Sequence, residues 1–369
     1  MRSLEIIKNL QCDTSFIQDK KEQTTYKIAY IKEYISYWIE VSIHRPNIKY
    51  INFIDCMCNA GIYADGDLAT SMEVLKIFRE KAYQNPDKEF NVYLNDISLE
   101  RIEIITKISQ KIISSPVTNI KIHINSMDVN VYLQKNTIFY TTCKFGATVL
   151  FVDPYDFGTV HISSIQRFIK NFYCEVIFNV FTSDYVRNGI DHRIRECIGD
   201  AKNINNKEDL IDYIISQLQI ENIKYHFSYR FHTATNTELY QIMFFTPHSR
   251  GIEKLKEALW KTFNGRFYHR NGKESYKDKG QVCFFDDNDD KNMLLNIHAS
   301  QAQELLFKYF EGQILDYVTI KNFLLQKTML QESHCIHYVL TPLIEANKIR
   351  KMNLKDRRNF KSDSFIIGI

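Results

Sequence analysis

The sequence predicts an α/β protein in which a doubly wound, mostly parallel sheet precedes a small helical module. Between residues 24 and 180, five short apolar runs alternate with segments of helical periodicity. Such alternation favours a parallel sheet, because each crossover lays a helix on one face of it. From about residue 291 the pattern changes to three short helices and a basic end.

Composition is ordinary for a soluble globular protein, with 369 residues, 44% hydrophobic and 25% charged. The length accommodates one large domain and one small domain. Apolar runs fall short of the roughly 20 residues of a membrane helix, and residues 1–10 lack a signal-peptide core. We therefore expect a cytoplasmic protein with no membrane partner. The net charge of +3 leaves any case for nucleic acid to local patches.

The larger domain is expected to span residues 1–280. An aromatic stripe at helical spacing over residues 24–42 is typical of a helix that packs on a sheet, with base stacking as the alternative. The strands that we predict lie at residues 51–55, 90–96, 120–124, 148–153, 175–180, 223–230 and 239–245, the last two as a hairpin. Helices are predicted at residues 71–82, 98–113, 162–171 and 248–264. The Arg-rich segment 184–206 is predicted to be a mobile cover or a solvated helix face.

Polar or acidic residues recur where the predicted strands end. They are Asp55, Asn95 with Asp96, Asp128, Asp153 and Asn179. In doubly wound sheets ligands bind outside the carboxyl ends of the strands, so this series outlines a crevice. The same acids could gather metal in a nuclease, but four separate strand ends suit a nucleotide crevice better than a compact two-metal site.

The eight cysteines form no pair of C-x-x-C motifs. Cys56 and Cys58 would share one face of an extended strand. No third and fourth ligands are evident nearby, so reduced, buried cysteines are favoured over a metal site.

The smaller domain is expected at residues 295–369, after an acidic linker at 281–294. Helices predicted at residues 301–310, 319–327 and 331–347, followed by a hairpin, match a winged helix-turn-helix. Its wing would bind phosphate through Lys348, Arg350, Lys351, Lys355, Arg357 and Arg358. Gln331, Ser333, His334 and His337 would face the groove. The alternative is a solvated basic tail on a protein-interaction module.

Several motifs together resemble one family. They read FIDCMCNAGIYADGD at 53–67, LNDIS at 94–98, FVDPYDFG at 151–158, EVIFNVF at 175–181 and MFFTPHSRGIEKLKEALWKTF at 243–263. This set resembles the bacterial three-Cys-motif partner proteins (TcmP), which have a Rossmann-like class I S-adenosylmethionine-dependent methyltransferase fold. The resemblance covers roughly residues 20–265. It implies S-adenosylmethionine as cofactor and a protein partner encoded nearby.

Carried onto this chain, the resemblance implies specific site residues. The first loop would bind the cofactor through Asp55, Asn59, Gly61 and Tyr63. Asp96 (or Asn95) would hold the ribose hydroxyls, and Asp128 would lie near the adenine amino group. Asp153, Pro154 and Tyr155 match the motif with which amino methyltransferases hold a target amine and stack on its base.

The sequence departs from the family twice. Asn59-Ala60-Gly61 replaces the usual Gly-Pro-Gly run, although Asn tolerates positive φ better than other non-glycine residues. The sequence Asp153-Pro154-Tyr155-Asp156 also lacks the second proline of the amino-methyltransferase motif. Two functions are therefore expected. One is an S-adenosylmethionine-dependent methyltransferase acting on nucleic acid. The other is a catalytically inactive methyltransferase-like scaffold that binds DNA or a protein through its winged helix.

Overall fold

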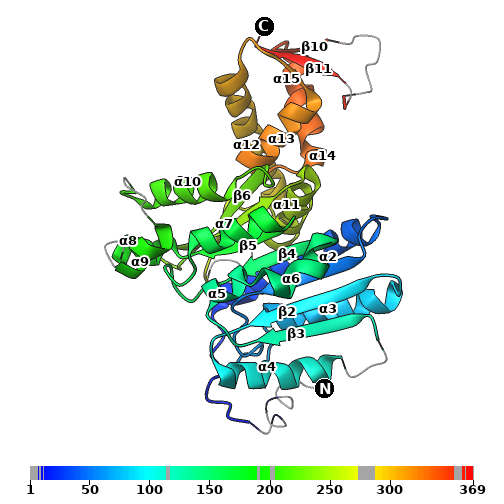
Figure 1. Ribbon diagram of the computed structural model, residues 1–369. Helices are drawn as coiled ribbons and strands as arrows, with labels where there is room; N and C mark the ends of the chain where they lie inside the picture. Colours follow the sequence, from blue (N-terminus) through cyan, green and yellow to red (C-terminus); the bar gives the residue numbers. More distant parts are fainter. Residues whose placement is uncertain are drawn as a thin grey trace. The chain divides into compact units, whose positions relative to one another are not determined.

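The computed structural model describes residues 7, 10, 12–113, 117–188, 192–199, 204–272, 287–352, 360, 361 and 363–368, with backbone alone at 287–290. The chain divides into two compact units. The larger comprises Met1–His248 with His269–Asn271, and the smaller comprises Ser249–Tyr268 with Gly272–Ile369. Figure 1 shows the elements of both.

An eight-stranded sheet forms the larger unit, in the order β3-β2-β1-β4-β5-β7-β6-β8. The strands are β1 (Tyr50–Asp55), β2 (Glu89–Asn95), β3 (Ile120–Asn125), β4 (Gly146–Val152), β5 (Glu175–Val180), β6 (Tyr225–His232), β7 (Glu238–Thr246) and β8 (Tyr268–Arg270). The first five pair in parallel, and β7 runs antiparallel to both β5 and β6. The α/β prediction is confirmed, and so is the predicted late hairpin.

The strand order reverses between β1 and β4, which are neighbours in the sheet although β2 and β3 lie between them in the chain. Such a reversal is a topological switch point. There the loops leaving two adjacent strands turn to opposite sides, and a crevice opens at the carboxyl ends of the strands. The predicted site residues Asp55 and Asp153 follow these two strands.

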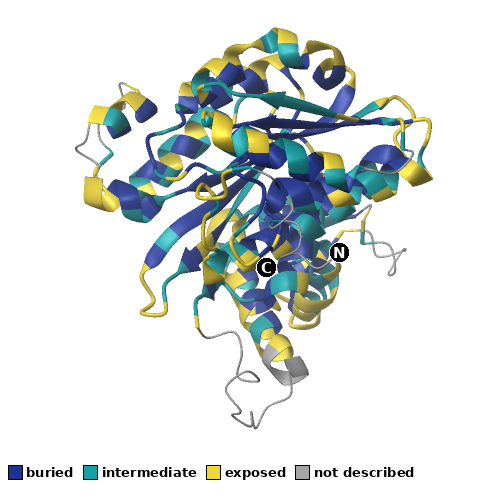
Figure 2. Cartoon of the chain, turned by 90° about the horizontal axis from the view of Figure 1, so that it is seen from below, coloured by how far each residue is buried: buried dark blue, intermediate teal, exposed yellow. Residues whose placement is uncertain are grey.

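Helices connect the strands. They are α2 (Glu22–Ile43), α3 (Thr70–Gln84), α4 (Leu99–Ile112), α5 (Val129–Gln134), α6 (Asn136–Lys144), α7 (Ile162–Asn171), α8 (Thr182–Asn188), α9 (His192–Ile198) and α10 (Lys207–Leu218). Helix α3 packs against α2 and α4, whereas α7 packs against α5 and α10. The aromatic stripe of α2 is largely buried, as predicted, with Tyr30, Tyr34 and Trp38 in the core. Figure 2 shows how burial follows the sheet and the inner helix faces.

The Arg-rich segment 184–206 is helical where it is described, in α8 and α9. Arg187 and Arg195 are exposed, as a solvated helix face would have them. Arg193 differs, because its guanidinium forms ion pairs with Asp156 and Asp184.

The smaller unit combines helices with a three-stranded antiparallel sheet in the order β10-β11-β9. Its elements are α11 (Ser249–Phe263), α12 (Asp287–Phe310), β9 (Ile314–Asp316), α13 (Tyr317–Lys327), α14 (Glu332–His334), a π-helical segment (Cys335–Leu340), α15 (Thr341–Glu345), β10 (Ile349–Lys351) and β11 (Ser364–Ile367). Buried Ile320, Leu324, Val339 and Phe365 belong to one core cluster of this unit.

Helix α11 belongs to this smaller unit, so the division falls at Ser249, earlier than the predicted boundary at 295. The indole Nε1 of Trp260 donates to the Met329 carbonyl at 2.5 Å. Residues 281–286 of the predicted acidic linker lie outside the described residues. The remaining linker residues, from Asp287, belong to helix α12. In the part of the chain that the structure describes, none of the helices is long and apolar enough to cross a membrane.

Candidate functional site

A cleft of about 170 Å³ opens beside the carboxyl ends of β1 and β4. Six of the predicted site residues line it, namely Asp55, Asn59, Tyr63, Asp153, Pro154 and Tyr155. Gly61, Asp96 and Asp128 are not among the lining residues. The segment that leads into α2 closes one side with Gln18 and Lys21, and the first turns of α2 add Lys27. None of these three residues was predicted from the sequence to belong to the site.

Asp55 ends β1 and is 3% exposed. Its Oδ1 accepts a hydrogen bond from the Met57 backbone N–H at 3.2 Å. Burial raises the pKa of the carboxyl to about 8, and the negative charges of Asp153 and Asp96 act in the same direction. At neutral pH Asp55 is therefore mostly a neutral acid, which can donate a hydrogen bond into the cleft as well as accept one.

Both carboxylate oxygens of Asp153 already have partners. Lys27 Nζ lies 2.5 Å from Oδ2, and Asn179 Nδ2 donates to Oδ1 at 2.7 Å. Lys27 is a buried cation within the apolar face of α2. Its ammonium stands where the resemblance would place a target amine, against the acid of the Asp-Pro-Tyr motif. The signal that could have revealed it is a lysine on the same helix face as Ile31 and Tyr34.

The first loop has the backbone that its sequence suggested. Asn59 has φ of 53° and Gly61 has φ of 75°, so asparagine supplies the left-handed turn. Both polar atoms of the Asn59 side chain form hydrogen bonds. Oδ1 accepts from the Ala60 N–H at 2.7 Å, and Nδ2 donates to Gln18 Oε1 at 3.3 Å. Gly61 is needed for packing, because an added Cβ would lie 2.7 Å from Ile105 Cγ1.

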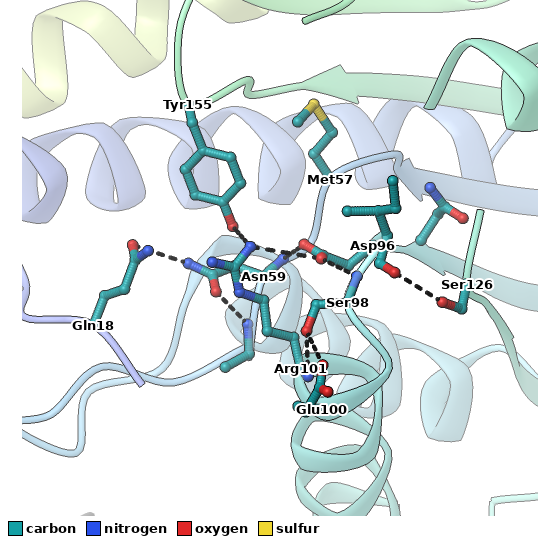
Figure 3. Close-up of polar contacts among 12 residues, drawn as sticks. Gln18, Met57, Asn59, Asp96, Ser98, Glu100, Arg101, Ser126 and Tyr155 are labelled. Carbon is teal, nitrogen blue, oxygen red and sulfur yellow. Dashed lines mark hydrogen bonds and ion pairs between the residues drawn. The ribbon is translucent and has the colours of Figure 1, made fainter. Parts of the chain in front are cut away.

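Asp96 follows β2 and its carboxylate is only 2% exposed. Oδ2 accepts from the Asn59 N–H at 3.1 Å, and Oδ1 accepts from the Ser98 N–H at 2.9 Å. Arg101 Nη1 lies 3.6 Å from the same Oδ1. The acid is thus where a ribose-binding residue is expected, but its own loop and Arg101 cover it (Figure 3).

Arg101, at the start of α4, reaches across to the loop after β4. Its Nη1 donates to the Tyr155 hydroxyl at 2.7 Å, and its guanidinium carbon lies 4.9 Å from the Tyr155 ring centre. Its Nε is buried with no hydrogen-bond partner among the described residues. A buried N–H left without a partner costs roughly 1–3 kcal/mol, so this arrangement is incompletely satisfied. Sequence reasoning missed Arg101, because nothing local links α4 to the Tyr155 loop.

Asp128 does not line the cleft, whereas Tyr240 does. Asp128 caps α5, with Oδ1 accepting from the Asn130 and Val131 N–H groups at 2.9 and 3.1 Å, and its role near adenine stays a prediction. Tyr240 of β7 lines the cleft, and its buried hydroxyl has no hydrogen-bond partner within the described part of the chain. A bound polar ligand would satisfy that hydroxyl.

The predicted phosphate-binding residues of the smaller unit separate into three groups. Lys348 and Arg350 are exposed, as a phosphate contact requires. Lys351 is buried, and its ammonium lies 3.2 Å from a carboxylate oxygen of Asp363, so it is not available to phosphate and this assignment is corrected. Lys355, Arg357 and Arg358 lie outside the described residues.

The predicted groove-facing residues also divide. Ser333 and His337 are exposed. His334 instead accepts from the Gln331 N–H at 3.3 Å and packs edge-on against Trp260. Burial lowers the pKa of His334 to about 4. His334 and Gln331 therefore cap the start of helix α14.

Metal ligands do not gather in the described residues, where no group of three or more His, Cys, Asp or Glu side chains could hold an ion. These residues therefore give the nuclease hypothesis no support. Cys56 and Cys58 are both buried and free, and burial raises the pKa of both thiols.

No family model matches the chain, and no curated protein matches it either. Solved structures do match. One is a protein from Listeria monocytogenes assigned to the class I S-adenosylmethionine-dependent methyltransferases, at 10% identity and a TM-score of 0.35, covering 67% of this chain and 66% of that one. Another is a protein from Klebsiella pneumoniae assigned as an O-methyltransferase, at 10% identity and a TM-score of 0.35, covering 66% and 88%.

A third match is a variant of the 16S rRNA (adenine(1408)-N(1))-methyltransferase from Catenulisporales acidiphilia. It is 9% identical with a TM-score of 0.29, and the match covers 58% of this chain and 90% of that one. At these identities and TM-scores the similarities establish neither an activity nor a cofactor for this protein.

The residues at the strand ends can be tested against S-adenosylmethionine by their chemistry. By type they fit. The Asp96 carboxylate can accept hydrogen bonds from ribose hydroxyls, and the neighbouring Ile97, which is 71% exposed, offers an apolar face for adenine. The Tyr240 hydroxyl has no hydrogen-bond partner among the described residues and could bind a polar group of the cofactor. Access is restricted, because Arg101 covers Asp96 and pockets for such ligands measure roughly 300–1,000 Å³. By type, then, the residues suit the cofactor, whereas in this structure Arg101 and the first loop cover Asp96.

Proposed function

We propose that the larger unit binds S-adenosylmethionine at the switch point and transfers its methyl group to nucleic acid. The observation that supports this most is the meeting of Asp55, the Asn59 loop and Asp153-Pro154-Tyr155 around one cleft. These groups come from the ends of two strands that are adjacent only in this topology. Open α/β sheets bind their ligands at this place.

On this proposal the chain holds the cofactor through groups on both sides of β1. Asp96 would accept hydrogen bonds from the ribose hydroxyls, and Ile97 would pack on the adenine. Lys21 lines the cleft and would attract the carboxylate of the methionine part. Bound S-adenosylmethionine supplies an electrophilic methyl group. The protein's own task is then to place a nucleophile and exclude water.

On the target side, Asp153 would accept a hydrogen bond from the target amine in place of Lys27. Asn179 would keep the carboxylate in position through its 2.7 Å hydrogen bond to Oδ1. The Tyr155 ring is 43% exposed and would stack on the target base. Lys27 has to move for this to happen, because its ammonium now occupies Oδ2.

We further propose that the smaller unit is a winged helix that binds the polymer. The element order after α11 supports this: helix α12, strand β9, helix α13, the consecutive helical segments from α14 to α15, and the antiparallel strands β10 and β11. Exposed Lys348 and Arg350 stand on either side of Ile349 at the start of the last hairpin. Cations there would neutralise phosphates without reading sequence.

Two observations favour the second candidate, a non-catalytic scaffold that recruits DNA or a protein partner through the smaller unit. Both oxygens of Asp153 are occupied, and Asp96 is covered. If these contacts are permanent, neither cofactor nor amine can enter. The two candidates therefore differ in whether the site opens.

Calorimetric titration with S-adenosylhomocysteine decides between them. The wild-type protein should bind, and Asp96→Asn should weaken binding at least tenfold, since losing a charge-assisted hydrogen bond costs roughly 1.5–3 kcal/mol. Asp87→Asn is the control, because Asp87 has a side chain 72% exposed in the loop before β2. A wild-type protein that does not bind the nucleoside at millimolar concentration would leave the scaffold as the function.

A further inference from the structure

One guanidinium nitrogen of Arg101 contacts both Asp96, on the proposed cofactor side of the site, and Tyr155, on the proposed target side. Arg101 Nη1 lies 2.7 Å from the Tyr155 hydroxyl and 3.6 Å from Asp96 Oδ1. Asp96 follows β2 and Tyr155 follows β4, so the arginine spans the end of β1 between them. Figure 3 shows its side chain reaching from α4 toward both residues.

Few strong interactions hold the Arg101 side chain in this position. The Arg101 side chain keeps 20% of its surface exposed, whereas the Asp96 carboxylate beneath it keeps 2%. Its Nε has no hydrogen-bond partner within the described part of the chain. The pairing with Asp96 at 3.6 Å is also longer than a good hydrogen bond. Leaving this position therefore frees Asp96 Oδ1 of the guanidinium and breaks one well-formed hydrogen bond, the one to Tyr155.

We propose that Arg101 is a positioning residue that couples the cofactor side of the site to the target side. With Asp96 free of ligand, Arg101 covers the acid and holds Tyr155. A ribose on Asp96 displaces the guanidinium, and Tyr155 is released to receive a base. Cofactor then precedes nucleic acid, and each strengthens the binding of the other, since such coupling is reciprocal. This inference rests on the proposed function.

Calorimetric titration with S-adenosylhomocysteine tests the coupling without any need for the target. Arg101→Ala should tighten binding about tenfold, because the covered state no longer competes with the ligand. Tyr155→Phe should tighten it about threefold, since it removes the hydroxyl that holds Arg101 in place. The double variant should bind like Arg101→Ala alone, because both changes remove the same contact.

Lys107→Ala is the matched control. It removes one positive charge from the same helix, where Lys107 pairs with Glu103 at 2.7 Å, and it should leave the affinity unchanged. Arg101→Lys should give an intermediate affinity, since an ammonium can cover Asp96 but lacks the planar guanidinium that stacks on a ring.

The outcomes separate this inference from the function beneath it. If the wild-type protein binds the nucleoside but Arg101→Ala binds equally or more weakly, the coupling is wrong and the proposed function stands. Additive effects of Arg101→Ala and Tyr155→Phe would also overturn the coupling. If Arg101→Ala binds but the wild-type protein does not, a ribose cannot displace Arg101, so the coupling falls, and the scaffold remains as the function. If neither protein binds, both proposals fall.

Discussion

Asp55 shows how a single buried acid can set the pH response of this fold. Its folded pKa of about 8 lies far above the value of roughly 3.9 in an unfolded chain. The folded state therefore keeps a proton that the unfolded state releases between these values. Stability from this group is fully present below pH 4 and is lost as pH rises toward 8. Glu175 acts in the same direction, because burial also raises its pKa to about 8.

The substitution Asp55→Asn should flatten this dependence. Asparagine keeps an acceptor for the Met57 N–H but carries no titrating proton. Between pH 5 and pH 7.5 the variant should lose about 3 kcal/mol less unfolding free energy than the wild type, measured by urea denaturation. Glu175→Gln should have an effect of similar size. A pH slope in Asp55→Asn equal to that of the wild type would contradict the raised pKa.

Residue types at the site were partly predictable, and their partners were not. The acids at strand ends could be read from the chain because a strand's end is a local pattern. Lys27 and Asp153 are 126 positions apart, and Arg101 and Tyr155 are 54 apart. No periodicity connects such pairs, so only the fold reveals that Asp153 and Asp96 are engaged.

At the scale of elements, the first loop and α4 constrain each other. Gly61 has a left-handed backbone conformation, and a Cβ added to it would lie 2.7 Å from Ile105 Cγ1 of α4. Periodicity predicted the strand before this loop and the helix after it. It could not predict that the glycine serves helix packing, because that depends on a neighbour 44 residues away in the sequence, at Ile105.

Two glycine substitutions separate packing from backbone strain. Gly61→Ala should lower the unfolding free energy by about 3 kcal/mol, combining left-handed strain with the clash. Gly199→Ala should cost only about 1 kcal/mol, since its φ is 66° but no atom lies within 4 Å of the added Cβ. Equal losses for the two variants in urea denaturation would show that Ile105 moves aside freely.

On the scale of the whole molecule, the change of pattern near residue 291 predicted a separate C-terminal domain, and the chain divides into two compact units. The start of the smaller unit at Ser249 was not visible, because α11 has the same amphipathic character as the helices of the larger unit. Its place in the smaller unit depends on tertiary contacts such as Trp260 with Met329.

Adjacent cations of the last hairpin should behave differently. Arg350→Ala should leave stability unchanged but weaken binding to a 30-base-pair duplex, and reduce the slope of affinity against salt by about 1. Lys351→Ala should instead destabilise the protein by about 3 kcal/mol, because it breaks a buried ion pair by removing the ammonium beside the Asp363 carboxylate. Fluorescence anisotropy and thermal unfolding measure the two effects. Unchanged duplex affinity in Arg350→Ala would remove this surface from the nucleic-acid interface.

A crystal structure grown with S-adenosylhomocysteine tests the central claim most directly. We expect density for an adenosyl group beside Asp96 and Ile97, with the Arg101 side chain withdrawn from Tyr155. Crystals grown at saturating ligand that show no nucleoside, with Arg101 still on Tyr155 and Lys27 still on Asp153, would contradict the claim that this switch point is a cofactor site.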